Sequence, residues 1–181
     1  MVKRRLGFTL IELLIVIALL GALAVGLLAA LDPFEQLKKG TDTGTRNTVG
    51  EFQGGVIRYY AIKNQMPWCG DDTCSTILNS VAGAAPVTLE SMNTVPGTIK
   101  NITDTGELKT DFANLAGGQL KNIWVTGTND PPVVRVCFKP TSKSFMADPN
   151  TKYGPDGTTP YTPLGGLCPN NVAGQCYYCI Q

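Results

Sequence analysis

A long apolar run near the N-terminus constrains this chain more than any other feature. From Phe8 to Leu31 the only ionisable side chain is that of Glu12. As a helix, about 24 residues at about 1.5 Å each would extend about 36 Å, which is enough to cross a bilayer with some tilt. The sequence therefore predicts a transmembrane helix over residues 8–31 with one carboxylate inside it.

Basic residues flank this run on its N-terminal side. Lys3, Arg4 and Arg5 precede it, and no Lys or Arg follows before Lys38. Because basic flanks tend to stay on the cytoplasmic side of a membrane, we expect the N-terminus in the cytoplasm and the residues after the run outside. Most of the chain is thus predicted to be exported.

The carboxylate of Glu12 needs an explanation. A charged residue in an apolar span costs about 2.5–3.5 kcal/mol on insertion scales and usually has a partner or a function. The span contains no basic side chain. Cleavage between Gly7 and Phe8 would free an α-amino group one helical turn from Glu12, where two groups share a helix face. We therefore predict that cleavage supplies the partner of this carboxylate.

The residues around this bond resemble the processing site of the bacterial type IV prepilin family, which includes the type II secretion pseudopilins. The likeness is carried by Lys-Arg-Arg-Leu-Gly-Phe-Thr-Leu-Ile-Glu-Leu-Leu at residues 3–14. It implies that a prepilin peptidase cleaves after Gly7 and methylates the new N-terminus of Phe8, and that Phe8 and Glu12 serve filament assembly. Lys3, Arg4 and Arg5 supply the charge of the leader peptide.

The resemblance also implies partners and a location. The partners are other copies of the chain and related pilins, the peptidase and methyltransferase, and the membrane platform with its assembly ATPase. The precursor is expected in the cytoplasmic membrane as a single-pass protein with its head outside. It then enters an extracellular or periplasmic filament.

The predicted fold class is α+β, with a long N-terminal helix that continues into a head whose antiparallel sheet packs on it, as in type IV pilins. The predicted segments are a leader at residues 1–7, a transmembrane and filament-core helix at 8–31, a helix continuation at 32–65, and a disulfide-rich head at 66–181. Pro33 should kink or locally open any helix that continues through it. Glycines cost helix stability, so we expect an interruption near Gly40–Gly44 and the end of the helix at about Asn64.

Local patterns predict the elements of the head. The expected elements are short helices at residues 75–82 and within 105–116, and strands at 123–126, 133–138 and 144–147 that form a meander. In the second strand Val134, Val136 and Phe138 alternate with Arg135, as a half-buried strand requires. The stretch 148–175, rich in Pro, Gly and Asn, predicts a long surface loop.

Asp148, Asn150 and Asp156 lie in this loop and carry oxygen ligands of the kind that calcium uses. Some pseudopilins bind calcium in a comparable loop. The spacing does not fit an EF-hand, and Asp and Asn are also common turn residues. Calcium binding and plain turns are therefore alternatives here, and no other cofactor is expected.

The cysteines predict a disulfide framework, because their number is even and the head is expected to be exported. The six are Cys69, Cys74, Cys137, Cys168, Cys176 and Cys179. Cys69 with Cys74 is the most local pairing. On a strand Cys176 and Cys179 would face opposite sides, so we expect different partners for them, with Cys168 and Cys137 available. The rival interpretation, a four-cysteine zinc site that includes Cys176 and Cys179, is disfavoured by export.

Composition excludes several functions. The chain has no histidine, which removes Ser-His and Cys-His nucleophile systems and the usual general base. The formal net charge of +1 gives no signal for nucleic-acid binding. We expect a structural subunit and not an enzyme.

Other interpretations of the same residues stay open at this point. An ordinary signal peptide would be cleaved after Ala24, and a plain anchor would tolerate Glu12. Within the resembled family, the alternatives are a minor pseudopilin of type II secretion and a tip or adhesin subunit. Outside it, the alternative is a membrane-anchored exported domain.

Overall fold

The computed structural model describes residues 7–30, 32–81, 83–158, 161, 168 and 175–181. It divides into two compact units, Met1–Leu37 and Lys38–Gln181. We describe each unit by itself, and call the second unit the head.

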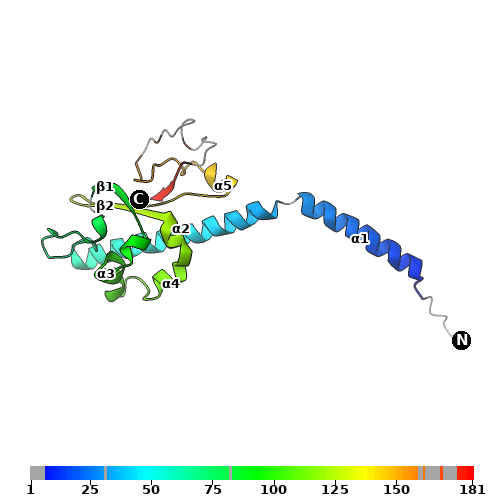
Figure 1. The fold of residues 1–181 in the computed structure, drawn as a ribbon, viewed down its shortest axis with the longest axis horizontal. Helices are drawn as coiled ribbons and strands as arrows, with labels where there is room; N and C mark the ends of the chain where they lie inside the picture. Colours follow the sequence, from blue (N-terminus) through cyan, green and yellow to red (C-terminus); the bar gives the residue numbers. More distant parts are fainter. Residues whose placement is uncertain (1–6, 31, 82, 159–160, 162–167, 169–174) are drawn as a thin grey trace. The chain divides into compact units, whose positions relative to one another are not determined.

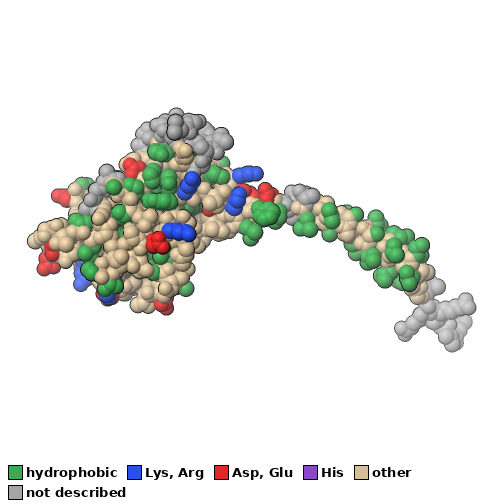
Figure 2. Space-filling model, in the orientation of Figure 1, with side chains coloured by type: hydrophobic (Ala, Val, Ile, Leu, Met, Phe, Trp, Pro, Cys, Tyr) green, Lys and Arg blue, Asp and Glu red, His purple; other side chains and the backbone are tan. Residues whose placement is uncertain are grey.

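The apolar run forms helix α1, Leu10–Ala30 (Figure 1). Its stretch Leu10–Leu28 is long and apolar enough to cross a membrane, and its side chains are exposed. Figure 2 shows hydrophobic side chains along this helix. Such a surface requires an apolar environment, which a bilayer or neighbouring helices would provide.

The break that Pro33 predicts is confirmed, because α1 ends at Ala30 and helix α2, Pro33–Lys63, begins at the proline itself. Proline suits the first position of a helix, where its missing N–H has no partner to lose. Asp32 caps α2, since its Oδ1 accepts a hydrogen bond from the backbone N–H of Glu35 at 3.2 Å. The helix ends at Lys63 as expected, with Asn64 in the left-handed conformation at φ 51°.

The predicted interruption near Gly40–Gly44 is wrong, because α2 is helical throughout this stretch. Threonine hydroxyls add bonds to the preceding turn: Thr43 Oγ1 donates to the carbonyl of Lys39 at 2.8 Å, and Thr45 Oγ1 donates to that of Thr41 at 3.0 Å. Asp42, between them, is hydrogen-bonded to residues 141–142, which lie far from it in the sequence. Tertiary contacts therefore outweigh the low helix propensity of glycine.

The head contains a four-stranded antiparallel sheet in the order β1-β2-β3-β4. Its strands are β1, Gly83–Thr88; β2, Ile123–Asn129; β3, Pro132–Phe138; and β4, Tyr178–Ile180 (Figure 1). The two strands predicted at 123–126 and 133–138 are confirmed as β2 and β3, which form a hairpin with Ile123 opposite Phe138. The sheet and the N-terminal apolar helix confirm the predicted α+β class, consistent with a pilin-like fold.

Short helices complete the head. They are α3, Thr98–Asp104; α4, Phe112–Ala116; α5, Lys143–Met146; and the 3-10 turns η1, Leu78–Ser80, η2, Glu90–Met92, and η3, Gly117–Asn122. The helix expected within 105–116 is present as α4, in its second half only.

Two local predictions are wrong. Among the described residues 75–81 only the turn η1 forms, residue 82 lies outside the described residues, and Gly83 opens a strand instead of stopping a helix. The strand expected at 144–147 is helix α5, because Ser142 acts as its N-cap and its Oγ accepts from the backbone N–H of Phe145 at 3.4 Å.

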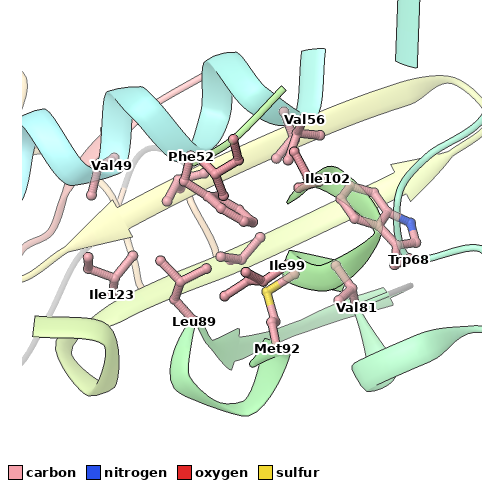
Figure 3. Close-up of a cluster of buried hydrophobic side chains, with 14 of the residues drawn as sticks. Val49, Phe52, Val56, Trp68, Val81, Leu89, Met92, Ile99, Ile102 and Ile123 are labelled. Carbon is pink, nitrogen blue, oxygen red and sulfur yellow. The ribbon is translucent and has the colours of Figure 1, made fainter. Parts of the chain in front are cut away.

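The core lies between α2, the sheet and the short helices. Val49, Phe52 and Val56 project from one face of α2 into a cluster that Leu89 and Ile123 help to complete (Figure 3). Phe52 stacks on Phe112 of α4 with 6.2 Å between ring centroids. The spacing of three and four residues along α2 is what places these side chains on a single face.

Candidate processing and assembly site

Glu12 lies in the first turn of α1, where Thr9 holds its carboxylate. The backbone N–H of Thr9 donates to Glu12 Oε2 at 2.8 Å, and the Thr9 hydroxyl donates to the same oxygen at 2.7 Å. In return, the backbone N–H of Glu12 donates to Thr9 Oγ1 at 3.3 Å. This reciprocal arrangement is a capping box, and it explains why the helix begins at Leu10.

The capping box is a feature that the sequence interpretation missed, although Thr9-Leu10-Ile11-Glu12 has the S/T-x-x-E spacing that predicts it. The sequence of the span supplies no basic side chain for Glu12. Glu12 nevertheless has two hydrogen-bond donors on Thr9. The carboxylate is therefore oriented before any cleavage takes place.

The bond between Gly7 and Phe8 lies directly before this capping box. Both residues are exposed and lie outside the helix. The Glu12 carboxylate is bonded to the backbone nitrogen of Thr9, and Thr9 directly follows Phe8. The carboxylate is therefore bonded one residue away from the Phe8 nitrogen that cleavage after Gly7 would free. Cleavage there would leave α1 and its cap intact. Lys3, Arg4 and Arg5 lie outside the described residues.

Comparison with known families identifies this segment. Residues 2–28 match the model of the prokaryotic N-terminal methylation motif. This motif is the prepilin signature of type IV pilins and pseudopilins, so the resemblance seen in the sequence is confirmed for this segment. No curated protein and no solved structure matches the chain. The motif supports a pilin or pseudopilin subunit, a structural role rather than an enzymatic one.

The cysteines of the head form three disulfides: Cys69–Cys74, Cys137–Cys179 and Cys168–Cys176. The first is the local pairing expected from the sequence. Cys176 and Cys179 have different partners, also as expected. Cys137 and Cys179 lie opposite each other on β3 and β4, so their bond ties the C-terminal strand to the sheet. With every cysteine joined in a pair, a four-cysteine zinc site has no ligands.

The candidate calcium ligands take part in turns. Asp148 Oδ1 accepts from the backbone N–H of Asn150 at 2.8 Å. Asp156 accepts from Thr158 through both carboxylate oxygens, from its backbone N–H at 3.2 Å and from its hydroxyl at 2.7 Å. Within the part of the chain that the structure describes, no three His, Cys, Asp or Glu side chains gather as metal ligands would. Calcium binding stays a prediction.

Asp71 organises the loop that the Cys69–Cys74 disulfide closes. Its carboxylate accepts from the backbone N–H and hydroxyl groups of Thr73 and Ser75 and from the backbone N–H of Thr76, at 2.6–3.0 Å. These bonds, first among them those from Thr73, hold the pKa of Asp71 far below its usual range. The Asx pattern could have been seen in Asp71-Asp72-Thr73, because aspartate often bonds the backbone two residues on.

Asp42 is the second carboxylate that the sequence interpretation missed. It is only 2% exposed and lies on α2. It accepts hydrogen bonds from the backbone N–H and hydroxyl of Thr141, at 2.9–3.1 Å, and from those of Ser142, at 2.7 Å. No sequence signal pairs these residues, because they are about 100 positions apart and no local motif joins them. The contact anchors α2 to the segment that follows β3.

Proposed function

We propose that this chain is a structural subunit, a pilin or pseudopilin, of a type IV pilus-like filament. The observation that carries the proposal is the match of residues 2–28 to the methylation motif. The geometry supports it, because the motif's Glu12 is held at the start of α1 by Thr9, the residue that directly follows Phe8. The exposed apolar surface of α1 also supports it, because such a helix needs a bilayer or other helices around it.

The mechanism is assembly. A prepilin peptidase cleaves the precursor after Gly7, and the amino group of Phe8 is methylated. The methylated amine keeps its positive charge and pairs with the Glu12 carboxylate of its own or a neighbouring subunit. That pairing removes the cost of an isolated charge in an apolar filament core. The membrane platform and its ATPase then move the subunit out of the bilayer, with α1 in the core of the filament.

The head is placed outside the cytoplasm in this proposal. Its disulfides agree with this, because such bonds persist in oxidising compartments and are rare in the cytosol. Before assembly, the precursor is anchored in the cytoplasmic membrane by α1.

The proposal is tested by determining the N-terminal residue and the intact mass of the membrane-extracted protein. We expect a chain that begins at Phe8, carries one added methyl group and has no free thiol. A chain that begins at Met1, or after Ala24, would overturn the proposed processing. Gly7→Val is the matched control, because a Cβ at Gly7 meets no atom within 4 Å and should not disturb the fold. This variant should retain its leader.

A second variant separates processing from assembly. Glu12→Gln keeps the size of the side chain and removes its charge. The processed N-terminus should remain, and the yield of sheared filaments should fall at least tenfold. Filaments at the wild-type yield would show that the charge of Glu12 is not required.

A further inference from the structure

Strand β4 covers only half of the strand beside it. It pairs with Val136, Cys137 and Phe138, whereas β3 begins at Pro132. On the other side, all seven residues of β3 pair with β2. Among the described residues, none pairs with the first half of β3 on the β4 side. This half of β3 is therefore an open edge of the sheet.

The backbone of Val134 points its hydrogen-bonding groups to this open edge. The carbonyl of Ile123 accepts from the N–H of Leu89, on the β1 side of β2. Its partner Phe138 therefore turns its N–H and C=O toward β4, and every second residue of β3, Val136 and Val134, does the same. The Cα atoms of the disulfide that joins β3 to β4 are 4.1 Å apart, which agrees with this alternation. No described residue lies opposite Val134 there, although Val134 is only 7% exposed.

An apolar groove of about 300 Å³ lies along the same edge. Its lining includes Val133 and Val134 of β3, Gln181 after β4, and Ile57 and Tyr60 of α2. No charged residue lines it. The groove thus lies between the open half of β3 and the second half of α2.

Helix α2 follows β4 toward this groove. The guanidinium carbon of Arg46 lies 5.3 Å from the ring centre of Tyr178, and a Cβ at Gly50 would lie 3.9 Å from Ile180 Cδ1. Four helical residues rise about 6.0 Å and two strand residues about 6.6 Å, so the helix and the strand advance together. The next turn of α2 carries Gln53, which lines the groove. The groove therefore lies where the next residues of β4 would pack on α2.

Gln53 gives a second indication of a ligand. It is 7% exposed, and no described residue forms a hydrogen bond with its side-chain amide. A buried amide without a partner is costly, so such groups are usually satisfied. A ligand for this groove should therefore carry hydrogen-bonding groups as well as apolar ones, and an extended polypeptide carries both.

We propose that the groove accepts an extended segment of a partner protein, which adds to the sheet as a continuation of β4. The segment lies antiparallel to β3. Its residue opposite Val134 donates its N–H to the Val134 carbonyl and accepts from the Val134 N–H. Side chains at that position and at every second one enter the groove, where β-branched apolar residues fit. In strand addition, main-chain hydrogen bonds give affinity and pockets for alternate side chains give specificity.

The partner is a different protein, because a second copy offers no described segment of this kind. The four described strands already belong to the sheet of their own head. Strand β1 has an open outer edge, but it contains Pro86, which lacks the N–H that a ladder needs. The inference goes beyond the proposed role of α1 in assembly and does not require that filaments form.

Peptide binding to the detergent-solubilised full chain tests the proposal. The probe is acetyl-Lys-Thr-Val-Thr-Val-Thr-Lys-amide, whose valines alternate as the groove requires. Hydrogen exchange is followed by NMR on chain with isotopically labelled valine, and the Val134 signal is identified by its loss in Val134→Ile. Saturating peptide should slow exchange of the Val134 N–H at least tenfold. The Val136 N–H, which already points to β4, should not change.

The matched control is the same peptide with both valine nitrogens methylated. It keeps every side chain and loses the N–H groups that pair with β3, so its affinity should be at least tenfold lower. Equal affinity of the two peptides, or no binding of the unmodified one, would overturn strand addition. Protection of the Val134 N–H without peptide that disappears on dilution would identify a second copy as the occupant, and would overturn the partner.

Variants of the chain test the groove itself. Ile57→Lys places a charge at the groove, and because Ile57 is 54% exposed the fold should be kept. Its affinity for the unmodified peptide should fall at least tenfold. Ile62→Lys is the control, because Ile62 is 59% exposed and does not line the groove, and it should bind as the wild type does. Wild-type affinity in Ile57→Lys, or an equal loss in both variants, would contradict the site.

Discussion

Asp71 makes the stability of the disulfide loop dependent on pH. In the folded chain its carboxylate is held by Thr73, Ser75 and Thr76, and its pKa is far below the usual range. In the unfolded chain it titrates near its ordinary value of about 4. A carboxylate whose pKa is lower in the folded chain than in the unfolded chain stabilises the fold at pH values above its pKa in the unfolded chain. That contribution is lost as the pH falls below it, because the unfolded chain then binds more protons.

Asp71→Asn should therefore unfold at a lower temperature near neutral pH and lose less stability on acidification than the wild type. The measurement is thermal unfolding of the detergent-solubilised chain at about pH 7 and about pH 3. Asp72→Asn is the control, because this neighbour accepts none of the bonds that fix the loop. This control should show the same difference in unfolding temperature between the two pH values as the wild type. If Asp71→Asn also showed the wild-type difference, Asp71 would not be the source of the pH dependence.

Asp42 is expected to contribute more to stability than any exposed acid on α2. Replacing it by alanine leaves the buried N–H of Ser142 without its acceptor and removes the acceptor at 2.7 Å from the Ser142 hydroxyl, which costs about 2–4 kcal/mol of unfolding free energy. Glu51→Ala removes only an exposed ion pair with Lys109 at 4.0 Å, worth about 0.5 kcal/mol or less. Denaturant unfolding of both variants checks this. Equal losses would show that the bonds to Ser142 add nothing.

These two acids, with Glu12, show which contacts a sequence can predict. The capping box of Thr9 and Glu12 and the Asx turn of Asp71 are local, so their spacing alone could have indicated them. Asp42 bonds to residues about 100 positions away, and no local pattern encodes that pairing. Local hydrogen bonds can therefore be predicted from spacing, whereas the partners of a buried acid that lie far away in the sequence can be identified only from the fold.

At the scale of elements, α2 tests the cost of glycine in a helix. A Cβ at Gly40 would meet no atom within 4 Å, whereas at Gly55 it would lie 3.2 Å from Ile102 Cγ2 and 3.4 Å from the carbonyl oxygen of Glu107. Gly40→Ala should therefore stabilise the chain by about 0.5–1 kcal/mol. Gly55→Ala should destabilise it by about 1 kcal/mol, because Ile102 is fully buried and cannot move away freely.

Thermal unfolding of the two glycine variants in the same detergent would compare their stabilities. The chemical change is identical, so any difference in sign comes from the surroundings of each position. If Gly40→Ala were also destabilising, that part of α2 would not be a regular helix in solution, and the interruption predicted from the sequence would be restored.

The strands show a similar division between local and distant information. β2 and β3 have alternating or β-branched sequences and were predictable. β1, with the sequence GAAPVT, has no such pattern and is a strand because it pairs with β2. β4 is three residues long and is held by β3 and by the Cys137–Cys179 bond. Elements that depend on a partner for their conformation are the ones the sequence interpretation missed.

At the scale of the whole molecule, we expect the order of charge and apolar length to determine which side of the membrane the head reaches. Lys3, Arg4 and Arg5 precede α1, and Lys38 and Lys39 follow it. Orientation follows the excess of Lys and Arg close to the ends of a span. Replacing the three leading basic residues by serine would leave Lys38 and Lys39 as the nearest basic residues.

The head of the Lys3→Ser, Arg4→Ser, Arg5→Ser variant should then stay in the cytoplasm, where thiols are kept reduced. Alkylation of the denatured protein without reductant, followed by mass measurement, should label all six cysteines in this variant and none in the wild type. Lys38→Ser, Lys39→Ser is the matched control, because it strengthens the original bias and should leave every disulfide formed. Intact disulfides in the leader variant would show that something other than these charges orients the chain. The disulfides of the head would then not depend, through export, on the charge of the leader.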